Sequence, residues 1–179
     1  IGANQGQNLS LKIGDMRANN LAVAGQAKIE LGATVTDGSG ASKIAGGKAD
    51  GTYTIDGTNL KDAKGNTVAT TADAGITWVG NDAGAIGKDT ITFTQKVDAG
   101  TITISNDKVT GISQFDSELE AGDYKYDSAN KQLLDGGGNV IATTTDGIEF
   151  KSAKDGTTVL LTLDAAQATD FELGVGGID

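Results

Sequence analysis

Residues 90–94 read Thr-Ile-Thr-Phe-Thr, and residues 101–104 read Thr-Ile-Thr-Ile. In both stretches an apolar side chain alternates with threonine, so a β-strand would place the apolar side chains on one face and the hydroxyls on the other. Similar stretches rich in β-branched residues occur at 33–36, 52–55, 76–79 and 159–163. The sequence therefore predicts strands across most of residues 30–163.

Short polar stretches with glycine separate these predicted strands. Asp-Gly pairs stand at residues 37–38, 56–57, 135–136, 146–147 and 155–156. Such pairs are typical of tight hairpin turns, because glycine adopts the positive φ angles that these turns need. Strands separated by close turns favour small antiparallel sheets, and the fold class is predicted to be mainly β.

A repeat covers the middle of the chain. The run Gly-Asn-Thr-Val-Ala-Thr-Thr-Ala-Asp at residues 65–73 matches Gly-Asn-Val-Ile-Ala-Thr-Thr-Thr-Asp at residues 138–146. Upstream, Gly51-Thr52-Tyr53 matches Gly122-Asp123-Tyr124, and downstream Trp78 falls opposite Phe150. A match of this length indicates two tandem related β units. We predict the first over residues 28–95 and the second over residues 96–163, with residues 1–27 and 164–179 forming a common base.

The two ends of the chain differ from the repeat. Residues 9–13, Leu-Ser-Leu-Lys-Ile, alternate cleanly after a turn at residues 5–8, which predicts a β-hairpin over residues 1–14. Asp15 is placed to begin a short helical turn, and Asp164 forms a capping box with Gln167 for a second one. The predicted architecture is two β units on a β-hairpin base, with only short helical turns.

Composition excludes several functions. The 179 residues include no His, no Cys and no Pro. Without His and Cys the chain cannot build a Ser-His-Asp or Cys-His nucleophile, a zinc site with thiolate or imidazole ligands, or an iron–sulfur centre. Its 24 acidic residues outnumber its 14 basic ones, and a net charge of −10 disfavours nucleic acid and anionic membranes as partners. No apolar run approaches the length of a membrane span.

Aspartate and glutamate remain as candidate catalytic groups. A glycosidase needs two carboxylates across a cleft and commonly an aromatic platform for the sugar, whereas aromatic residues make up 4% of this chain. The string Gly136-Gly137-Gly138-Asn139 lacks the aspartates of a calcium loop and the Lys-Ser/Thr of a phosphate loop. We expect no catalysis, no cofactor and no metal site.

One end of the chain carries a family resemblance. Residues 1–16, Ile-Gly-Ala-Asn-Gln-Gly-Gln-Asn-Leu-Ser-Leu-Lys-Ile-Gly-Asp-Met, with Leu21-Ala22-Val23 behind them, closely resemble the segment of bacterial flagellins that follows their N-terminal helices. Residues 30–163 are similar in composition and β character to the hypervariable insertion of that family. Residues 175–179, Val-Gly-Gly-Ile-Asp, are similar to the strand that precedes the C-terminal helix. The chain is expected to be a central fragment of a flagellin, without the terminal helices.

The resemblance implies a structural role and no enzymatic activity. A flagellin subunit polymerises with other flagellin subunits into the extracellular flagellar filament that drives motility. The two β units would form its outer, antigenic surface, open to host immune recognition, and the fragment alone would be monomeric. Six hairpin residues are expected to pack between subunits: Ile1, Asn4, Leu9, Leu11, Ile13 and Met16. Packing within the monomer is the alternative for this hairpin.

The resemblance has two further implications. Flagellins are exported unfolded, which suits a chain without cysteine or proline because prolyl isomerisation is slow. Many of them carry O-linked sugars, which makes five threonines candidates for glycosylation: Thr70, Thr71, Thr143, Thr144 and Thr145. High strand propensity alone also explains threonine at these positions.

Two other functions are weighed against the flagellin reading. A secreted or surface adhesin, or a glycan-binding module of tandem β repeats, explains the repeat and the composition but not the two ends of the chain. An enzyme inserted in a flagellin, such as a metallopeptidase, would need a His-Glu-x-x-His motif. That motif cannot exist in a chain without histidine.

Overall fold

The computed structural model describes residues 26–176. They form fifteen strands and no helix, which confirms the mainly β class. The predicted helical turn after Asp164 is wrong, because the backbone N–H of Gln167 donates to the Gly147 carbonyl instead of closing a turn. The part of the chain that the structure describes also contains no helix long and apolar enough to cross a membrane. The predicted hairpin at residues 1–14 and the turn after Asp15 lie outside the described residues.

Most connections between successive strands are short, and the longest spans residues 37–50. In chain order they are β1 (Gln26–Gly32), β2 (Thr34–Thr36), β3 (Gly51–Asp56), β4 (Asn59–Lys61), β5 (Thr67–Thr71), β6 (Thr77–Gly80), β7 (Thr90–Thr92), β8 (Thr101–Ser105), β9 (Lys108–Asp116), β10 (Gly122–Asp127), β11 (Gln132–Asp135), β12 (Val140–Thr143), β13 (Glu149–Ser152), β14 (Val159–Thr162) and β15 (Phe171–Val175). Within residues 26–176, every stretch that the alternation predicts as a strand contains one.

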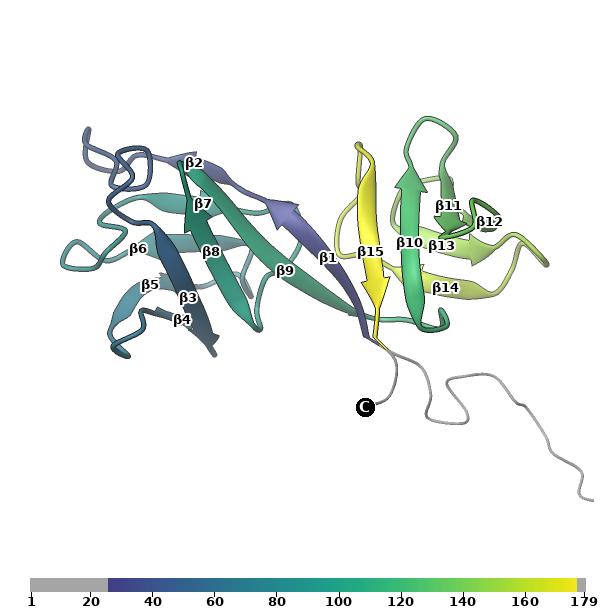
Figure 1. Cartoon of the computed structure of the whole chain (residues 1–179), viewed down its shortest axis with the longest axis horizontal. Helices are drawn as coiled ribbons and strands as arrows, with labels where there is room; N and C mark the ends of the chain where they lie inside the picture. The colour runs from purple at the N-terminus through teal and green to yellow at the C-terminus, as the bar shows by residue number, and fades with distance from the viewer. Residues whose placement is uncertain (1–25, 177–179) are drawn as a thin grey trace, which may run out of the picture.

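All strand pairs are antiparallel and belong to one sheet. Its order is β14-β13-β12-β11-β10-β15-β1-β9-β8-β3-β4-β5-β6-β7-β2. The sequence predicts small antiparallel sheets and leaves open whether the two units share one. The long pairing of β1 with β9, from Gln26 opposite Asp116 to Gly32 opposite Thr110, joins both units in a single sheet. Figure 1 shows these two strands running between two lobes, one built from β2 to β8 and the other from β10 to β15.

The strand order is symmetric about the β1–β9 pair. On one side follow β8, β3, β4, β5, β6 and β7, and on the other β15, β10, β11, β12, β13 and β14. Equivalent residues have equivalent partners: Tyr53 faces Ile102, and Tyr124 faces Leu173. The lobes are thus related by a twofold symmetry of topology.

The symmetry sets the extent of the repeating structure. Corresponding strands run over residues 26–105 and 108–175, whereas the sequence predicts units over 28–95 and 96–163. The difference arises because β8 and β15 complete the lobes by pairing with β3 and β10. The segment at 96–100, which resembles residues 28–32 of β1 in sequence, is a connection between strands.

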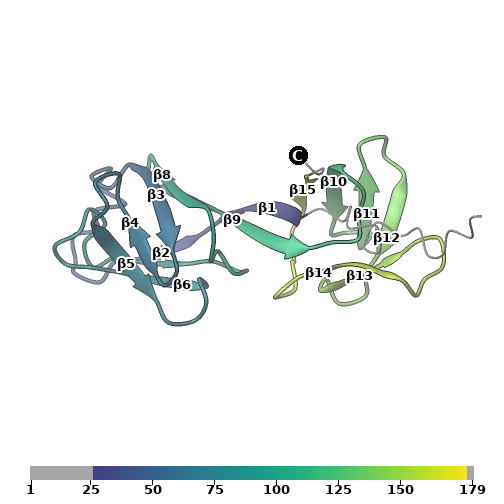
Figure 2. The ribbon, with the colours of Figure 1, turned by 90° about the horizontal axis from the view of Figure 1, so that it is seen from below.

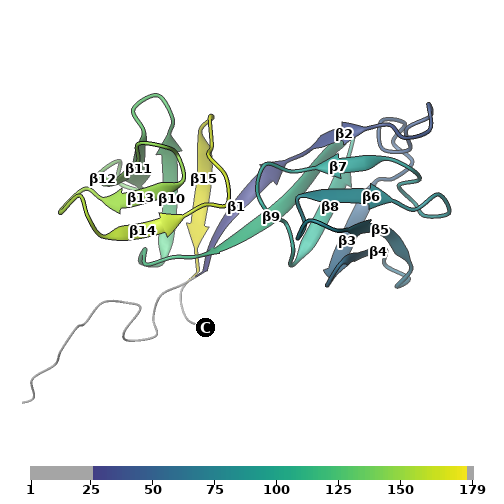
Figure 3. The ribbon, with the colours of Figure 1, turned by 180° about the vertical axis from the view of Figure 1, so that it is seen from behind.

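Each arm of the sheet curls back to the central pair. On one side β2 continues β1 after the single residue Ala33 and pairs with β7. On the other side Ser117 bridges to Leu161, and the Glu118 N–H donates to the Leu160 carbonyl at 2.9 Å, which brings β14 to the end of β9. Figures 2 and 3 show both lobes wrapping around an interior.

The apolar face of each lobe packs into that interior. Trp78 and Phe150, which correspond in the repeat, are both fully buried and lie opposite Ile91 and Leu161 in equivalent strand pairs. In the second lobe Phe150 joins an aromatic cluster with Tyr126 and Phe171, whose ring centroids lie 5.0 to 6.3 Å apart. Most of the few aromatic side chains of this chain are thus buried, where they pack with a largely aliphatic core.

The two ends of the described chain lie side by side. Ala27 faces Val175 in the β1–β15 pair, and the Gly176 N–H donates to the Gln26 carbonyl at 3.3 Å. In Figure 1 the coloured ribbon begins with β1 and ends with β15 at the same place, between the two lobes. The chain therefore enters and leaves the pair of lobes at neighbouring points.

Candidate functional site

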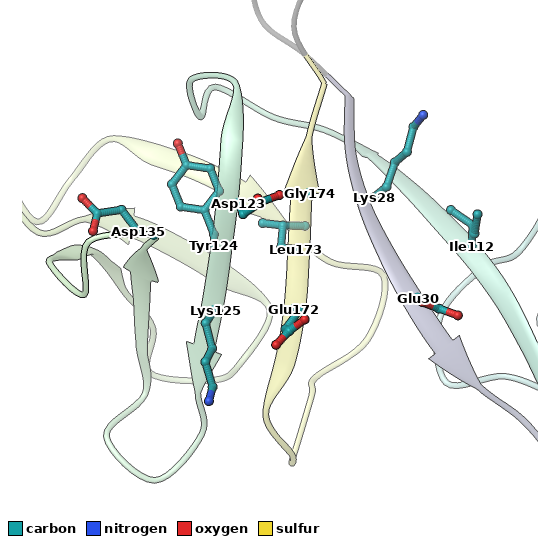
Figure 4. Close-up of a pocket in the computed structure, with 11 residues that line it drawn as sticks. Lys28, Glu30, Ile112, Asp123, Tyr124, Lys125, Asp135, Glu172, Leu173 and Gly174 are labelled. Atoms are coloured by element: carbon teal, nitrogen blue, oxygen red, sulfur yellow. The ribbon is translucent and has the colours of Figure 1, made fainter.

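A groove of about 470 Å³ lies on the outer face of the sheet where β10, β15 and β1 run side by side. Figure 4 shows the side chains that line it. Alternation along the strands turns Leu173 and Tyr124 towards the second lobe, while their neighbours face outwards. The outward-facing charged residues of the groove are Lys28, Glu30, Asp123, Lys125 and Glu172.

Gly174 hollows the middle of the groove. It pairs with Asp123 on one side and with Lys28 on the other, so the row across the three strands lacks a central side chain. The Asp123 Oδ1 atom lies over this gap, 3.9 Å from where a Cβ on Gly174 would stand. In the first lobe the corresponding residue is Thr103, whose side chain fills the row. The groove is therefore a feature that one repeat does not share with the other.

The charged side chains of the groove face the solvent. Lys125 stands opposite Glu172 across the strand pair. None of the ion pairs formed within residues 26–176 uses the two lysines or the three carboxylates of this groove. The groove thus offers charged groups of both signs to a polar ligand.

Tyr124 lies at one side of the groove, with its side chain turned towards the core of the second lobe. Its hydroxyl donates to the Glu120 carbonyl at 2.9 Å, which holds the ring in place. Burial, with the nearby carboxylates of Glu120 and Asp135, raises the pKa of Tyr124 above its ordinary value. The phenol therefore stays protonated at neutral pH and anchors this edge of β10.

Asp135 at the same end is already occupied by its own turn. Its carboxylate accepts hydrogen bonds from the Asn139 side chain, from the Asn139 N–H and from the Gly137 N–H. These bonds, the Asn139 side chain first, hold the pKa of Asp135 below its usual value. Asp135 is thus an ionised turn residue and does not supply a proton. Residues 26–176 contain no cluster of three or more acidic side chains able to hold a metal ion.

The five candidate glycosylation threonines are placed differently from one another. Thr70, Thr143 and Thr145 are exposed, and their modification stays a prediction. Thr71 and Thr144, in contrast, are buried, with 8% and 7% of their surface exposed. Their hydroxyls donate to Asp73 at 2.9 Å and to Asp146 at 3.1 Å, because each closes the turn after its strand.

The filament-packing residues predicted from the sequence all fall outside the described part of the chain. They are Ile1, Asn4, Leu9, Leu11, Ile13 and Met16, and their role stays a prediction. The groove, conversely, was missed by sequence reasoning. The available signal was the glycine at position 174 where the other repeat has Thr103, and it becomes meaningful only once the strands are paired.

No protein-family model, no curated protein and no solved structure matches this chain.

Proposed function

We propose that residues 26–176 form the outer, solvent-facing part of a subunit of the bacterial flagellar filament, and that their role is structural. The observation that carries this proposal is the adjacency of the two described ends. Ala27 and Val175 face each other in antiparallel strands, a spacing of about 5 Å. A module that projects from a scaffold has to leave and rejoin it at neighbouring points, and these ends meet that requirement.

The flanking sequence supports the same arrangement. Residues 1–16 resemble the flagellin segment before the variable insertion, and residues 175–179 resemble the segment after it. These two stretches lead to and from the point where the lobes begin and end. Subunits would polymerise through the inner region, and the two lobes would project into the medium outside the cell.

The charge of the lobes fits an exposed surface. Residues 108–176 contain twelve acidic and five basic side chains, and residues 26–107 contain ten acidic and seven basic ones. An acidic surface stays hydrated and keeps neighbouring filaments apart, because like charges repel. It also presents a large polar area to host antibodies.

A deletion in the full-length subunit tests the proposal. Replacing residues 27–175 by two glycines joins Gln26 to Gly176 without stretching the chain, since the two ends are neighbours. We expect this subunit to assemble into filaments of reduced diameter. Export of the shortened subunit at the normal level without filaments would contradict the proposal. The comparison variant is Leu11→Asp in the full-length subunit, which we expect to weaken assembly because it places a charge in the predicted packing hairpin.

The groove favours a second candidate, a glycan-binding adhesin. Its exposed charged groups of both signs, around the gap at Gly174, are of the kind that hold a polar ligand. Gly174→Thr tests this candidate, because the other repeat accommodates threonine at the same position and the variant should fold. Binding to a glycan array by the unmodified chain, lost in Gly174→Thr, would make the adhesin the leading function. If the unmodified chain binds no glycan on the array, the filament role stays as the single candidate function.

A further inference from the structure

The second lobe contains a cavity of about 270 Å³ that shares no residue with the groove. The residues that line it are Tyr126, Ser128, Lys131, 146–147 and 166–168. Tyr126 faces Phe171, the first residue of β15. Val175, at the other end of β15, faces Ala27. The cavity, called the Tyr126 cavity below, therefore lies at the end of the lobe opposite to the point where the chain enters and leaves (Figure 1).

The hydroxyl of Tyr126 takes part in no hydrogen bond formed within residues 26–176. The residue is 2% exposed, and its ring packs with Phe150 and Phe171. The fully buried side-chain atoms without a partner in this part of the chain are Trp78 Nε1 and Ser113 Oγ. The Tyr126 hydroxyl is not among them, because the small exposed part of this residue opens into the cavity. The cavity thus holds a polar group that lacks a partner in the protein.

The first lobe has neither this hydroxyl nor the turn that borders the cavity. Tyr53 and Tyr124 are equivalent, since each donates its hydroxyl to the carbonyl four residues before it. Two residues further on, Tyr126 therefore occupies the position of Ile55. The turn between β10 and β11 spans residues 128–131, whereas the turn between β3 and β4 has two residues. The cavity is built from differences between the repeats, so the fold itself does not require it.

Hydrogen bonds fix the longer turn beside the cavity. Asp170 accepts the N–H of Ser128 at 2.9 Å and its hydroxyl at 2.7 Å, which ties the turn to the segment before β15. The Lys131 ammonium donates to the Thr145 carbonyl. The walls are therefore held in place by the protein alone. The ammonium keeps further N–H donors, and the Ser128 hydroxyl oxygen keeps a free lone pair.

The groups at the cavity favour a neutral ligand rich in hydroxyls. Asp146 lines the cavity, and its carboxylate accepts two backbone N–H groups of its own turn. Such bonds lower the pKa of Asp146, and bonds from Ser128 lower that of Asp170, so both carboxylates are ionised and repel an anion. A cation would meet the Lys131 ammonium and carboxylates that are already bonded.

We propose that the Tyr126 cavity binds one sugar ring of a neutral glycan, with a hydrogen bond between the Tyr126 hydroxyl and a hydroxyl of the sugar. Burial, with the nearby carboxylates, raises the pKa of Tyr126, so the phenol keeps its proton and both donates and accepts. Ala166 and Ala168 add methyl groups for the C–H face of the ring. The volume lies just below the ~300 Å³ at which pockets for drug-sized ligands begin, which suits a single ring.

A pair of variants tests whether the hydroxyl is unpartnered. Tyr126→Phe keeps the aromatic cluster and removes the hydroxyl, so the thermal midpoint should stay or rise. Tyr53→Phe is the matched control, because that buried hydroxyl donates to the Ala49 carbonyl at 2.7 Å and its loss should lower the midpoint. Equal lowering in both variants would show that the Tyr126 hydroxyl already has a partner, and would overturn the proposal.

Amide spectra of the ¹⁵N-labelled chain test the binding. The probes are the methyl glycosides of glucose, galactose and N-acetylglucosamine, at up to about 50 mM because ligands this small bind weakly. At least one should shift residues 126–131, 146–147 and 166–170, about tenfold more weakly in Tyr126→Phe and unchanged in Tyr53→Phe. No shift with any glycoside, an equal response in Tyr126→Phe, or shifts with inorganic phosphate alone would overturn the proposal.

The Tyr126 cavity and the groove are told apart by Gly174→Thr. Sugar shifts at residues 126–131 should persist in this variant, because the cavity and the groove share no residue. Shifts that lie on the groove and disappear in Gly174→Thr would place the sugar there and overturn the proposal. None of these outcomes bears on the filament role, which the deletion of residues 27–175 tests by itself.

Discussion

Gln95 and Ala165 are hydrogen-bonded to each other in both directions. The Ala165 N–H donates to Gln95 Oε1 at 2.9 Å, and Gln95 Nε2 donates to the Ala165 carbonyl. Gln95 is fully buried, and the two residues lie in the connections that follow the equivalent strands β7 and β14. An ion pair of 3.5 Å between Lys96 and Asp164 lies beside them. These contacts tie the lobes together next to the β1–β9 pair.

Removing the Gln95 side chain should loosen this tie. Gln95→Ala leaves the Ala165 N–H and carbonyl without these partners in a partly buried site, and we expect the free energy of unfolding to fall by about 1–2 kcal/mol. Urea unfolding followed by tryptophan fluorescence measures it, since Trp78 is the single tryptophan. Gln167→Ala is the control, because its bond to Thr94 at 3.3 Å is exposed. Equal stability of the two variants would contradict this role for Gln95.

Gly111 should not accept a side chain. A Cβ at this position would stand 2.8 Å from the Phe93 ring and 2.8 Å from Val97 Cγ1, both buried, so Gly111→Ala should lower the free energy of unfolding by about 1–3 kcal/mol. Gly32→Ala, in the paired strand β1, meets nothing within 4 Å and should be nearly neutral. Thermal unfolding compares the two. Adding Val97→Ala to Gly111→Ala should cost less than the sum of the single changes, and strict additivity would show that no clash exists.

Asp155 should make folding sensitive to acid. Its carboxylate accepts the Thr157 and Thr158 N–H groups at 2.9 Å and the Thr158 hydroxyl at 2.7 Å, and these bonds lower its pKa from 3.8 to about 2. Because the pKa is lower in the folded chain, the ionised carboxylate stabilises the fold above about pH 4, and this contribution is lost as the pH falls towards about 2.

Replacing Asp155 should therefore reduce the dependence of stability on pH. In Asp155→Asn the urea midpoint should fall less between about pH 5 and about pH 2 than in the parent chain, since asparagine does not titrate. An NMR titration of the Asp155 carboxyl in the parent chain checks the cause directly. A titration midpoint near 4 would mean that the three hydrogen bonds do not act on it.

Refolding should lack the slow phase that proline causes. The chain has no Pro, so no prolyl isomerisation of tens of seconds can limit it. Pairing between distant strands such as β1 and β15 is slower than local pairing, but it is faster than prolyl isomerisation. We therefore expect the full fluorescence change within seconds. Stopped-flow dilution from urea measures it. A dominant phase of tens of seconds would remove the advantage that the missing prolines offer an exported chain.

Local pattern was sufficient to find individual strands. The alternation Thr-Ile-Thr-Ile at residues 101–104 predicts what the structure contains as β8, because one face is buried and the other is not. The alternation does not predict strand β9, because Gly111 interrupts its series of alternate apolar residues. The glycine is explained only by the Phe93 and Val97 side chains that pack against it in three dimensions.

The features that the sequence did not predict depend on contacts between residues that are far apart in the chain. The expected helical turn after Asp164 failed because Gln95 holds the Ala165 N–H and the Gly147 carbonyl holds the Gln167 N–H. The groove likewise combines Lys28 with Asp123 across Gly174, three residues that meet only because β1 and β10 both pair with β15. Neither feature follows from residues that are neighbours in sequence.

Immunogold electron microscopy of the cells that produce this protein, with antibodies raised against this 179-residue chain, tests the central claim most directly. If the lobes form the outer part of a filament subunit, gold particles should decorate flagellar filaments along their whole length. Antibodies absorbed with the same chain should give no decoration. Gold confined to the cell body, with bare filaments, would contradict the filament role and favour a surface adhesin.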